Sequence, residues 1–569
     1  MQHLSSPKHP RLAAGLLLLL LLLLAGTTAW AQAPAWQMAV ATTQANGTEA
    51  HVTVSAANSA GEVYVAGYFS GTMTLGGTTL ASVGSHDIFI AKWSRTTGSF
   101  RWAQRAGGTG DDRATGLATS GATVYMTGTF SSPTADFGPV TLTNAGAQDA
   151  FVAKLSDAGG NGSYVWTQQI GGMGDDTAEA VALSGPNLYV AGSFSNQVNF
   201  GATPLTSAGL TDVFVAKLTD TGNSASFLWS LRAGGGSYDN ATAVAVNGTN
   251  VYVAGDFYIS AYFGTINLNG AGNADVFVAK LSDAGGTGSF VWAQQAGGNQ
   301  DDHSQALAVS GPNVYVSGRF RSTPARFGGI FLNTFGNYDV FVTKLTDTGS
   351  AGSFGWTQQA GGQANDHGNT IAVSGTSIYI AGAFNIAGGS STASFGSITL
   401  DAANGTLFVA KISDVGTNSA ITWVQQAGGP GTGEADGMAI NGTSVYIGGT
   451  VLPPSWFGSF ATPAMGGPAA FLASLTDPTL TATTAARSDF SFALAPNPAH
   501  AATSLTLPAV PGAATATLTL LDALGRAVRT RPATPGTRTD FDLSGLAPGL
   551  YALRATAGAA TATQRLVVE

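Results

Sequence analysis

Four short apolar segments recur along the chain, each bounded by turn-forming residues. In residues 301–361 they lie at 306–309, 314–318, 340–345 and 354–359. The segments are rich in Val, Phe, Tyr and Trp and are separated by Gly, Asn, Asp, Ser or Pro, a pattern typical of β-strands joined by tight turns. The pattern therefore predicts an all-β protein.

The four segments repeat seven times in the same order. The second segment places a tyrosine at 64, 125, 189, 252, 315, 379 and 446, and the fourth places a tryptophan at 36, 102, 166, 229, 292, 356 and 423. This unit is longer than the roughly 40–45 residues of a WD40 blade. The surplus lies between the second and third segments, where a Phe-Gly pair such as Phe327-Gly328 indicates an additional element.

The ends of the array predict a closed ring. The chain enters the first unit with Trp36, which belongs to a fourth segment, whereas the seventh unit ends after its third segment at 471–475. A propeller closes by building one blade from both chain ends, while a linear solenoid needs polar capping repeats. We predict a seven-bladed β-propeller over 32–476, with four strands per blade and an N-terminal strand that completes the last blade.

The unit resembles a bacterial β-propeller repeat family (SBBP-like repeats). The resemblance is carried by Asn187-Leu188-Tyr189-Val190-Ala191-Gly192 and Asp149-Ala150-Phe151-Val152-Ala153-Lys154-Leu155. It covers nearly the whole ring and implies the fold, but it implies almost nothing about function.

Composition narrows the function classes. The 569 residues include 77 glycines and no cysteine, only 10% are charged, and the net charge is −9. The acidic balance argues against nucleic-acid binding, and the lack of cysteine excludes disulfides and thiolate metal sites.

The first 31 residues have the three parts of a secretory signal peptide: a basic start, the run Leu16–Leu24, and Ala29-Trp30-Ala31 before the cleavage point. An uncleaved anchor is the alternative. No later stretch approaches the length of a transmembrane helix, so we predict an exported chain without a transmembrane segment.

Two repeated polar features are predicted to be structural. The six lysines after residue 31 (92, 154, 217, 280, 344 and 411) share one repeat position, and each is expected to reach a carboxylate of an acidic loop in the same or the next blade. The acidic loops, such as Asp111-Asp112, could bind Ca²⁺ through oxygen ligands. Their drifting identity favours carboxylates that accept backbone N–H bonds in turns, so we predict no metal and no cofactor.

Departures from the repeat mark the candidate ligand site. An arginine and aromatic group in one connection between the second and third strands comprises Arg319, Arg321, Arg326, Phe331, Phe335 and Tyr338. Arginine with aromatic residues suits a carboxylated glycan or peptide, and a solvated loop without function is the alternative. Other departures are Tyr258, Tyr262, His303, His367 and Trp456. We expect the repeat tryptophans to pack between blades; stacking on a sugar is their alternative.

No catalytic residues are nominated. The chain has no cysteine, no G-x-S-x-G turn and no HExxH metal pair, and the histidines at 51, 86, 303, 367 and 500 are scattered in the sequence. We predict a non-enzymatic module that binds a glycan or protein. A polysaccharide lyase or hydrolase and a structural surface component are the alternatives.

The C-terminal region differs from the ring in composition. Residues 477–489 are small and polar and are predicted to be a linker, and residues 490–569 read as short alternating strands of a small Ig-like β-sandwich. This module resembles the type A C-terminal sorting domain of the type IX secretion system. The residues that carry the resemblance include Pro496, Asn497, Pro498, Asp522, Gly525, Arg526, Leu546, Gly549 and Tyr551.

Two departures, Ala495 and Glu569, do not break this match. The resemblance implies a Bacteroidota-type source and export through the periplasm. It also implies removal of the domain by the sortase of that system, followed by release or attachment to surface lipopolysaccharide.

Overall fold

The structure is a computed structural model. It describes residues 33–45, 47–386, 392–429, 431, 433–462, 467–480, 492, 494–508, 515–522, 526–557 and 560–569. In these ranges the regular structure is almost entirely strand, and the one helical element is the 3₁₀ turn η1 (Ala402–Asn404). The all-β prediction is confirmed, and the signal peptide predicted over 1–31 lies outside the described residues.

Seven four-stranded antiparallel units dominate the chain. We number them as blades 1–7 and their strands from one to four in chain order. Blade 1 contains β3 (Ala50–Ala57), β4 (Glu62–Phe69), β7 (Asp87–Ser94) and β8 (Ser99–Gly108). Blade 2 contains β9 (Asp112–Ser120), β10 (Thr123–Phe130), β13 (Asp149–Asp157) and β14 (Gly162–Gly172), and blade 3 contains β15 (Asp176–Ser184), β16 (Asn187–Phe194), β19 (Asp212–Asp220) and β20 (Ala225–Ala233). Blade 4 contains β21 (Asp239–Asn247), β22 (Asn250–Phe263), β23 (Ile266–Asp283) and β24 (Gly288–Gly297).

Blade 5 contains β25 (Asp302–Ser310), β26 (Asn313–Phe320), β29 (Asp339–Asp347) and β30 (Gly352–Gly362). Blade 6 contains β31 (Asn365–Ser374), β32 (Ser377–Ile386), β35 (Leu407–Asp414) and β36 (Ser419–Ala427). Blade 7 contains β37 (Gly433–Asn441), β38 (Ser444–Val451), β41 (Ala469–Thr476) and β1 (Trp36–Ala41).

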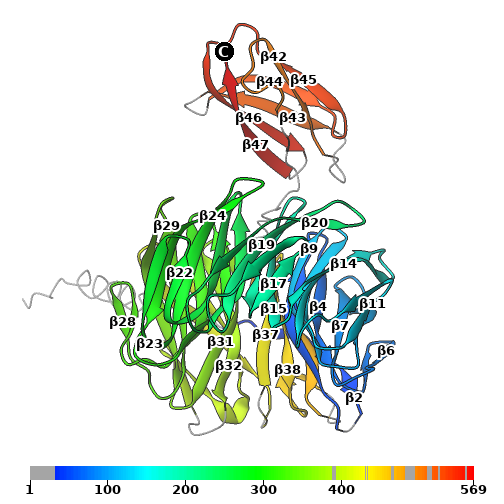
Figure 1. The fold of residues 1–569 in the computed structure, drawn as a ribbon, viewed down its shortest axis with the longest axis vertical. Helices are drawn as coiled ribbons and strands as arrows, with labels where there is room; N and C mark the ends of the chain where they lie inside the picture. The colour runs from blue at the N-terminus through cyan, green and yellow to red at the C-terminus, as the bar shows by residue number, and fades with distance from the viewer. Residues whose placement is uncertain are drawn as a thin grey trace, which may run out of the picture.

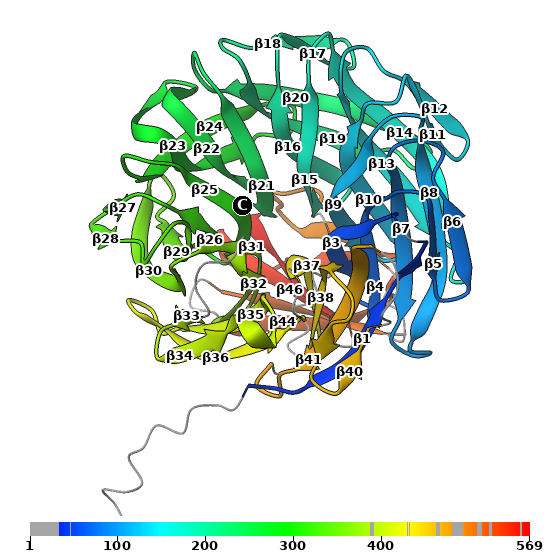
Figure 2. The same ribbon diagram turned by 90° about the horizontal axis from the view of Figure 1, so that it is seen from below.

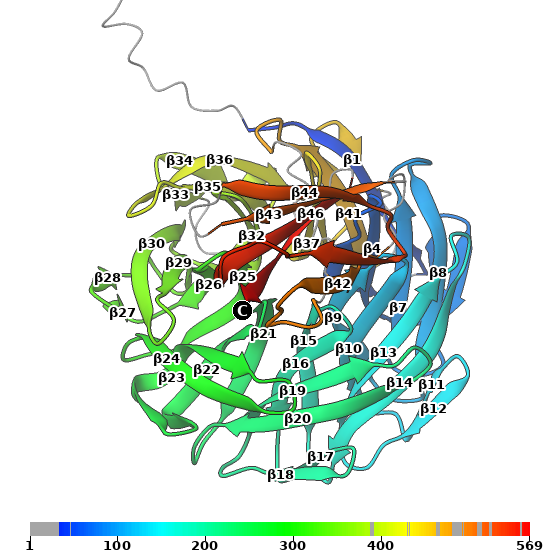
Figure 3. The same cartoon turned by 90° about the horizontal axis from the view of Figure 1, so that it is seen from above.

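The blades are arranged in a closed ring (Figures 2 and 3). The first strands of successive blades contact one another around the centre, and β37 of the last blade contacts β3 of the first. The N-terminal strand β1 pairs antiparallel with β41, with Ala41 opposite Phe471, and so supplies the fourth strand of blade 7. This strand lies beside the end of the array, as the position of Trp36 predicts.

The surplus of each repeat forms a hairpin that docks on the preceding blade. These strand pairs are β5 (Thr72–Leu75) and β6 (Thr78–Ala81), β11 (Thr134–Phe137) and β12 (Val140–Thr143), β17 (Gln197–Phe200) and β18 (Thr203–Thr206), β27 (Ala325–Phe327) and β28 (Ile330–Leu332), β33 (Thr392–Phe395) and β34 (Ile398–Asp401), and β39 (Trp456–Phe457) and β40 (Phe460–Ala461). In blade 4 the hairpin is continuous with β22 and β23. Four-strand blades thereby become six-stranded sheets, for example when β27 pairs with β24; the first hairpin pairs instead with the short strand β2 (Thr43–Gln44).

The Phe-Gly pair is the turn of this hairpin. Phe327 is fully buried, and its ring centroid lies 4.9 Å from that of Phe341. Gly328 adopts φ of +62°, a left-handed conformation that favours glycine. The pair therefore fastens each hairpin to the core while turning the chain.

The repeated Tyr, Lys and Trp of blades 1–5, and the Tyr and Lys of blade 6, meet one aspartate of the next blade. In blade 4, Tyr252 donates to Asp347 Oδ2 at 2.7 Å, Lys280 binds the same oxygen at 2.7 Å, and the Trp292 indole N–H donates to Oδ1 at 3.0 Å. We call this arrangement a clasp. Its aspartate is Asp157, Asp220, Asp283, Asp347, Asp414 or Asp477 at six of the seven junctions.

The clasp corrects one prediction and extends another. The lysine partner is at the end of the third strand of the next blade, not in an acidic loop, because each lysine lies in the second half of its own third strand whereas the acidic loops lie near the start of that strand. The repeat tryptophans are all buried, with 3–8% of their surface exposed, so they pack between blades and do not stack on a sugar.

The predicted linker starts too early. Asp477 accepts hydrogen bonds from Lys411 and Tyr379, and Leu480 is buried in the core shared by blades 6 and 7. Residues 477–480 therefore belong to the ring, and only 481–489 of the predicted linker lie outside the described residues.

The C-terminal strands form a separate body (Figure 1). One sheet pairs β42 (Ala502–Thr506) with β45 (Arg538–Asp542), and the other contains β43 (Ala516–Leu521), β44 (Ala527–Ala533), β46 (Gly549–Ala557) and β47 (Ala560–Val568). A single core of Leu, Phe and Ala residues is shared by both sheets.

The predicted sorting motifs shape this body. Asn497 donates to the Arg565 carbonyl at 2.7 Å and accepts from the Val567 N–H at 2.9 Å, so it fixes the last strand. Arg526 closes a turn on Asp522 at 2.8 Å, and Tyr551 donates to the Ala547 carbonyl at 2.9 Å. Gly525 lies outside the described residues.

Candidate functional site

One mouth of the ring carries residues that differ from blade to blade. The first strand of each blade places a half-buried side chain just inside its start, and a residue of the second strand pairs directly opposite. The first-strand set is His51, Arg113, Thr177, Asn240, His303, His367 and Glu434, and the second-strand set is Tyr68, Thr129, Ser193, Asp256, Arg319, Ala383 and Thr450. We call these fourteen positions, together with the loop and strand residues that contact them at this mouth, the rim.

No two blades have the same pair of rim residues, although the tyrosine near the centre of the second strand is identical in all seven. The packing of one blade on the next requires the constant tyrosine, whereas the rim positions carry no such repeated role. The seven first-strand positions are half-buried and polar, and variation at such positions on a rigid scaffold is typical of a binding surface.

Contacts across the rim run in one direction around the ring. The second-strand residue of a blade meets the first-strand residue of the following blade. Arg113 lies over the ring of Tyr68 at 4.2 Å, and His303 lies 3.5 Å from Asp256. Thr450 of blade 7 contacts His51 of blade 1 at 2.9 Å, which continues the pattern through the closure.

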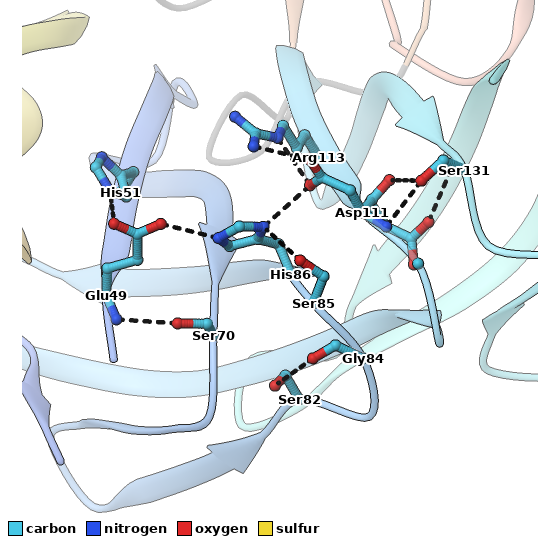
Figure 4. Close-up of polar contacts among 12 residues, drawn as sticks. Glu49, His51, Ser70, Ser82, Gly84, Ser85, His86, Asp111, Arg113 and Ser131 are labelled. Carbon is cyan, nitrogen blue, oxygen red and sulfur yellow. Dashed lines mark hydrogen bonds and ion pairs between the residues drawn. The ribbon is translucent and has the colours of Figure 1, made fainter. Parts of the chain in front are cut away.

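The first group of rim side chains joins blades 1 and 2 (Figure 4). His86 lies between two carboxylates, with Nε2 at 2.8 Å from Glu49 Oε1 and Nδ1 at 3.3 Å from Asp111 Oδ1. Arg113 donates to both oxygens of Asp111 at 2.8 Å, and Glu49 also lies 3.3 Å from His51. Each charge in this group faces an opposite charge or an imidazole.

Proton affinities in this group follow from those contacts. Burial alone would raise the pKa of Glu49, but its hydrogen bonds with His86 and His51 lower it below the ordinary value. Burial lowers the pKa of His51, whose ring stacks on Tyr68 with centroids 4.6 Å apart. Arg113 balances the charge of Asp111 in this group.

The second group of rim side chains joins blades 5 and 6. The guanidinium carbons of Arg319 and Arg321 lie 5.3 and 5.8 Å from the centroid of the Tyr338 ring. Arg319 Nη1 is 3.3–3.4 Å from the ring nitrogens of His367, and the His303 ring lies 6.3 Å from that of Tyr338. We call His303, Arg319, Arg321, Tyr338 and His367 the arginine cluster.

The structure brings three of the six predicted site residues together and separates the others. Arg319, Arg321 and Tyr338 meet at the rim. Arg326 and Phe331 pair with each other on the β27–β28 hairpin, which docks on blade 4 at the outside of the ring. Phe335 follows that hairpin, with its N–H bound to Asp339. The six residues therefore do not form one patch, because the connection folds outward between its two ends.

The histidines that look scattered in the sequence gather at this mouth. His51, His303 and His367 occupy the same repeat position, the second or third residue of the first strand, and His86 precedes the third strand of blade 1. Superposing the seven repeats on their strand boundaries would have found the three equivalent positions. Linear spacing did not find them.

The acidic loops carry pairs of buried aspartates. The first member begins a third strand, or lies within the long strand β23 in the case of Asp275, and the second member is the first or second residue of the first strand of the next blade. The pairs are Asp87–Asp112, Asp149–Asp176, Asp212–Asp239, Asp275–Asp302 and Asp339–Asp366. In each pair the first member accepts a loop N–H through Oδ2, such as that of Ala271 by Asp275 at 2.6 Å. Turn capping by carboxylates is thus observed.

The remaining oxygen of each first member points at the second carboxyl. Oδ1 of Asp87, Asp149, Asp212, Asp275 and Asp339 is buried and has no hydrogen-bond partner in the described ranges. A Cβ placed on Gly107 would lie 3.2 Å from Asp87 Oδ1 and 2.7 Å from Asp112 Oδ2, so both oxygens flank this glycine. Burial, with the neighbouring Asp149, raises the pKa of Asp176 to about 8, and burial raises that of Asp239 to about 7.

Comparison with known families places the C-terminal region. Residues 493–569 match the family described as the secretion system C-terminal sorting domain. The chain is therefore a type IX secretion substrate that reaches the cell surface or the medium. In the described part of the chain, no helix combines the length and the apolar composition needed to cross a bilayer.

One curated protein resembles a short part of this chain. Regulatory protein FlaEY of Caulobacter vibrioides is 34% identical over 140 residues, which is 24% of this chain and 14% of that protein. The chain thus spans about 14% of the length of this curated relative.

Two solved structures of Trypanosoma rangeli sialidase are similar to the chain. The complex with sialic acid has 9% identity and a TM-score of 0.34 and covers 83% of this chain and 85% of its own. The mutant displaying trans-sialidase activity has 10% identity and a TM-score of 0.31 and covers 79% and 82%. At such TM-scores, the propeller assignment rests on the strand pairing of the chain itself.

Proposed function

We propose that the ring is a non-enzymatic binding module that the type IX secretion system delivers to the cell surface or the medium, and that the rim holds its glycan or protein ligand. The sorting domain supports the delivery. The observation that carries the binding role is the rim itself, where all four histidines of the ring and its two arginine-bearing groups face one mouth.

The repeat supplies its own neutral version of the rim. Blade 3 carries Thr177 opposite Ser193, which are small, uncharged residues at the same register as the charged pairs elsewhere. A variant His303→Thr/Arg319→Ser therefore installs the blade 3 pair in blade 5 with little expected change in backbone packing. The variant His51→Thr/Tyr68→Ser does the same in blade 1.

We expect at least one of these double variants to lose tenfold or more of its affinity for the ligand found by screening the purified protein against polysaccharides and matrix proteins. Its melting temperature should stay within a few degrees of the parent, since surface substitutions usually change stability by no more than about 0.5 kcal/mol. The control is Trp456→Ser, because Trp456 is 46% exposed on a peripheral hairpin. Equal loss in all three variants, or release of reducing sugar from a bound polysaccharide, would contradict a non-enzymatic rim site.

Deletion of residues 490–569 is expected to leave the ring in the periplasm. The sorting domain has its own core, and the ring core closes on Leu480, so the truncated ring should fold without it. Immunoblots of periplasm, surface and medium measure the distribution. Equal amounts of truncated and full-length protein in the medium would show that export does not depend on this domain.

A further inference from the structure

We propose that the arginine cluster is a subsite for the carboxylate of a uronate-containing polysaccharide. This inference rests on the proposed binding role of the rim and names the ligand class for one part of it. The groups that carry it are the two guanidiniums of Arg319 and Arg321, the Tyr338 ring beneath them, and the imidazoles on either side.

The first argument is the missing anion. Arg105, Arg113 and Arg232 each pair with an aspartate of the ring. Within the described ranges, neither Arg319 nor Arg321 has an ion pair with a carboxylate, and Arg319 Nε is buried without a hydrogen-bond partner. A buried donor on a charged group without a partner costs stability, and two guanidiniums without a carboxylate partner offer the bidentate geometry that a bound carboxylate favours.

The second argument is how Arg319 is held. His367 lies against it, and burial together with the charge of Arg319 lowers the pKa of His367 to about 4. The imidazole is therefore neutral at physiological pH and positions the guanidinium without cancelling its charge. On the other side, Asp256 lies 3.5 Å from His303 and so already faces another partner. Burial raises the pKa of Glu434 of blade 7 and the charge of Arg319 acts to lower it, but the two side chains form no ion pair in the described ranges. Positive charge is therefore left at the rim for a ligand.

The third argument selects a sugar ring over a peptide side chain. Tyr338 lies under both guanidiniums, and two further aromatic residues, Tyr238 and Tyr258, line the neighbouring rim with centroids 6.2 Å apart. Tyr238 is 50% exposed. Aromatic faces next to paired guanidiniums match a flat sugar that carries a carboxylate at its edge, since each face buries apolar surface beside a charge-assisted hydrogen bond.

The test compares polygalacturonate with its carboxyl-reduced polymer, using the purified full-length protein and its variants. We expect the uronate polymer to bind at least tenfold more tightly than the reduced polymer and Arg319→Lys to lose at least fivefold, because lysine cannot form the bidentate pair. Arg319→Ser/Arg321→Ser should abolish binding. The matched control is Arg326→Ser, since this arginine lies in the same connection but on the outer hairpin and donates only to the Gly328 carbonyl.

Each other outcome overturns the inference. Equal binding of the reduced polymer would show that the protein does not recognise the carboxylate. Tighter binding of poly-glutamate or of dextran sulfate would assign the subsite to an acidic protein or to a sulfated glycan. Loss of binding in Arg326→Ser equal to that in Arg319→Ser would make the effect one of overall charge. No binding of polygalacturonate refutes the subsite, while the rim variants on other ligands still decide the proposed function separately.

Discussion

The variant Lys280→Met is expected to destabilise the ring by about 3–5 kcal/mol, the cost of breaking a buried ion pair by removing one partner. Lys280 is 4% exposed and binds Asp347 Oδ2 at 2.7 Å. Methionine keeps most of the side-chain volume, so the loss reports a buried carboxylate that keeps its hydrogen bonds from Tyr252, Trp292 and the Gly349 N–H but has no cation beside it. Denaturant unfolding of the purified protein measures it.

Two controls separate the ion pair from packing. Lys280→Met/Asp347→Asn removes both charges and should recover part of the loss, because no uncompensated charge stays buried. Arg95→Met changes the position equivalent to Asp347 at the junction between blades 7 and 1, where Arg95 is exposed, and should change stability by no more than about 0.5 kcal/mol. If Lys280→Met costs no more than Arg95→Met, the clasp does not stabilise the ring as we describe.

Stability of the ring is expected to peak at mildly acidic pH and to fall on both sides. Burial raises the pKa of Asp275 and Asp366 to about 6, of Asp239 and Asp339 to about 7, and of Asp176 to about 8. The folded ring binds these protons more tightly than the unfolded chain, so their stabilisation is complete below the unfolded pKa near 4 and is lost progressively as the pH rises from about 4 through the folded pKa values of about 6 to 8. Each pKa unit of separation corresponds to about 1.4 kcal/mol.

The clasps act in the opposite direction. Although burial would raise it, the bonds from Lys411, Thr479 and Tyr379 lower the pKa of Asp477 to about 2. Such a carboxylate stabilises the fold above the unfolded pKa near 4 and loses this effect as the pH falls toward 2. Melting temperatures from pH 2 to 9 test both limbs.

Asp176→Asn should flatten the alkaline limb, because the amide has no proton to lose. Asp136→Asn is the matched control, since Asp136 is exposed on β11. A melting temperature that rises between pH 6 and 8 would contradict the protonated pairs.

The repeat made the fold predictable from the sequence, because the regular spacing of residues such as Tyr189 and Tyr252 indicates that they occupy equivalent positions in successive blades. The closure was predictable for the same reason, since Trp36 has the identity of a fourth strand without the other three. The aspartate that each clasp lysine binds was not predictable from the sequence. Lys217 reaches Asp283, 66 residues away, and nothing in the local sequence indicates that a lysine binds the following blade and not its own.

The candidate site was only half predictable. Arg319 and Tyr338 lie at the two ends of one connection, and the structure joins them because β26 and β29 are neighbours. Arg326 is seven residues from Arg319 in sequence but lies on the hairpin that crosses to blade 4. Closeness along the chain therefore does not predict closeness in space where a connection docks on another blade. The position of each residue within its repeat predicts better which side chains lie together.

One junction of the ring lacks the clasp. Between blades 7 and 1, Ser474 stands where the other blades have lysine, and Arg95 stands where they have aspartate; the indole N–H of Trp36 donates instead to the Gln426 carbonyl. Both charged partners are replaced together, so neither is buried alone. The junction is held by the contact of β37 with β3, by the bonds of Asn441 to the Asn58 carbonyl and of Thr450 to His51, and by apolar packing.

This absence bears on polymerisation. The clasp is a head-to-tail contact, and such contacts build open filaments when they join separate molecules. A ring that opens at its closure presents the face of blade 7 with Ser474 and the face of blade 1 with Arg95. These two end faces cannot form a clasp with a second copy, so a chain of opened molecules would lack the clasp at every contact between its members.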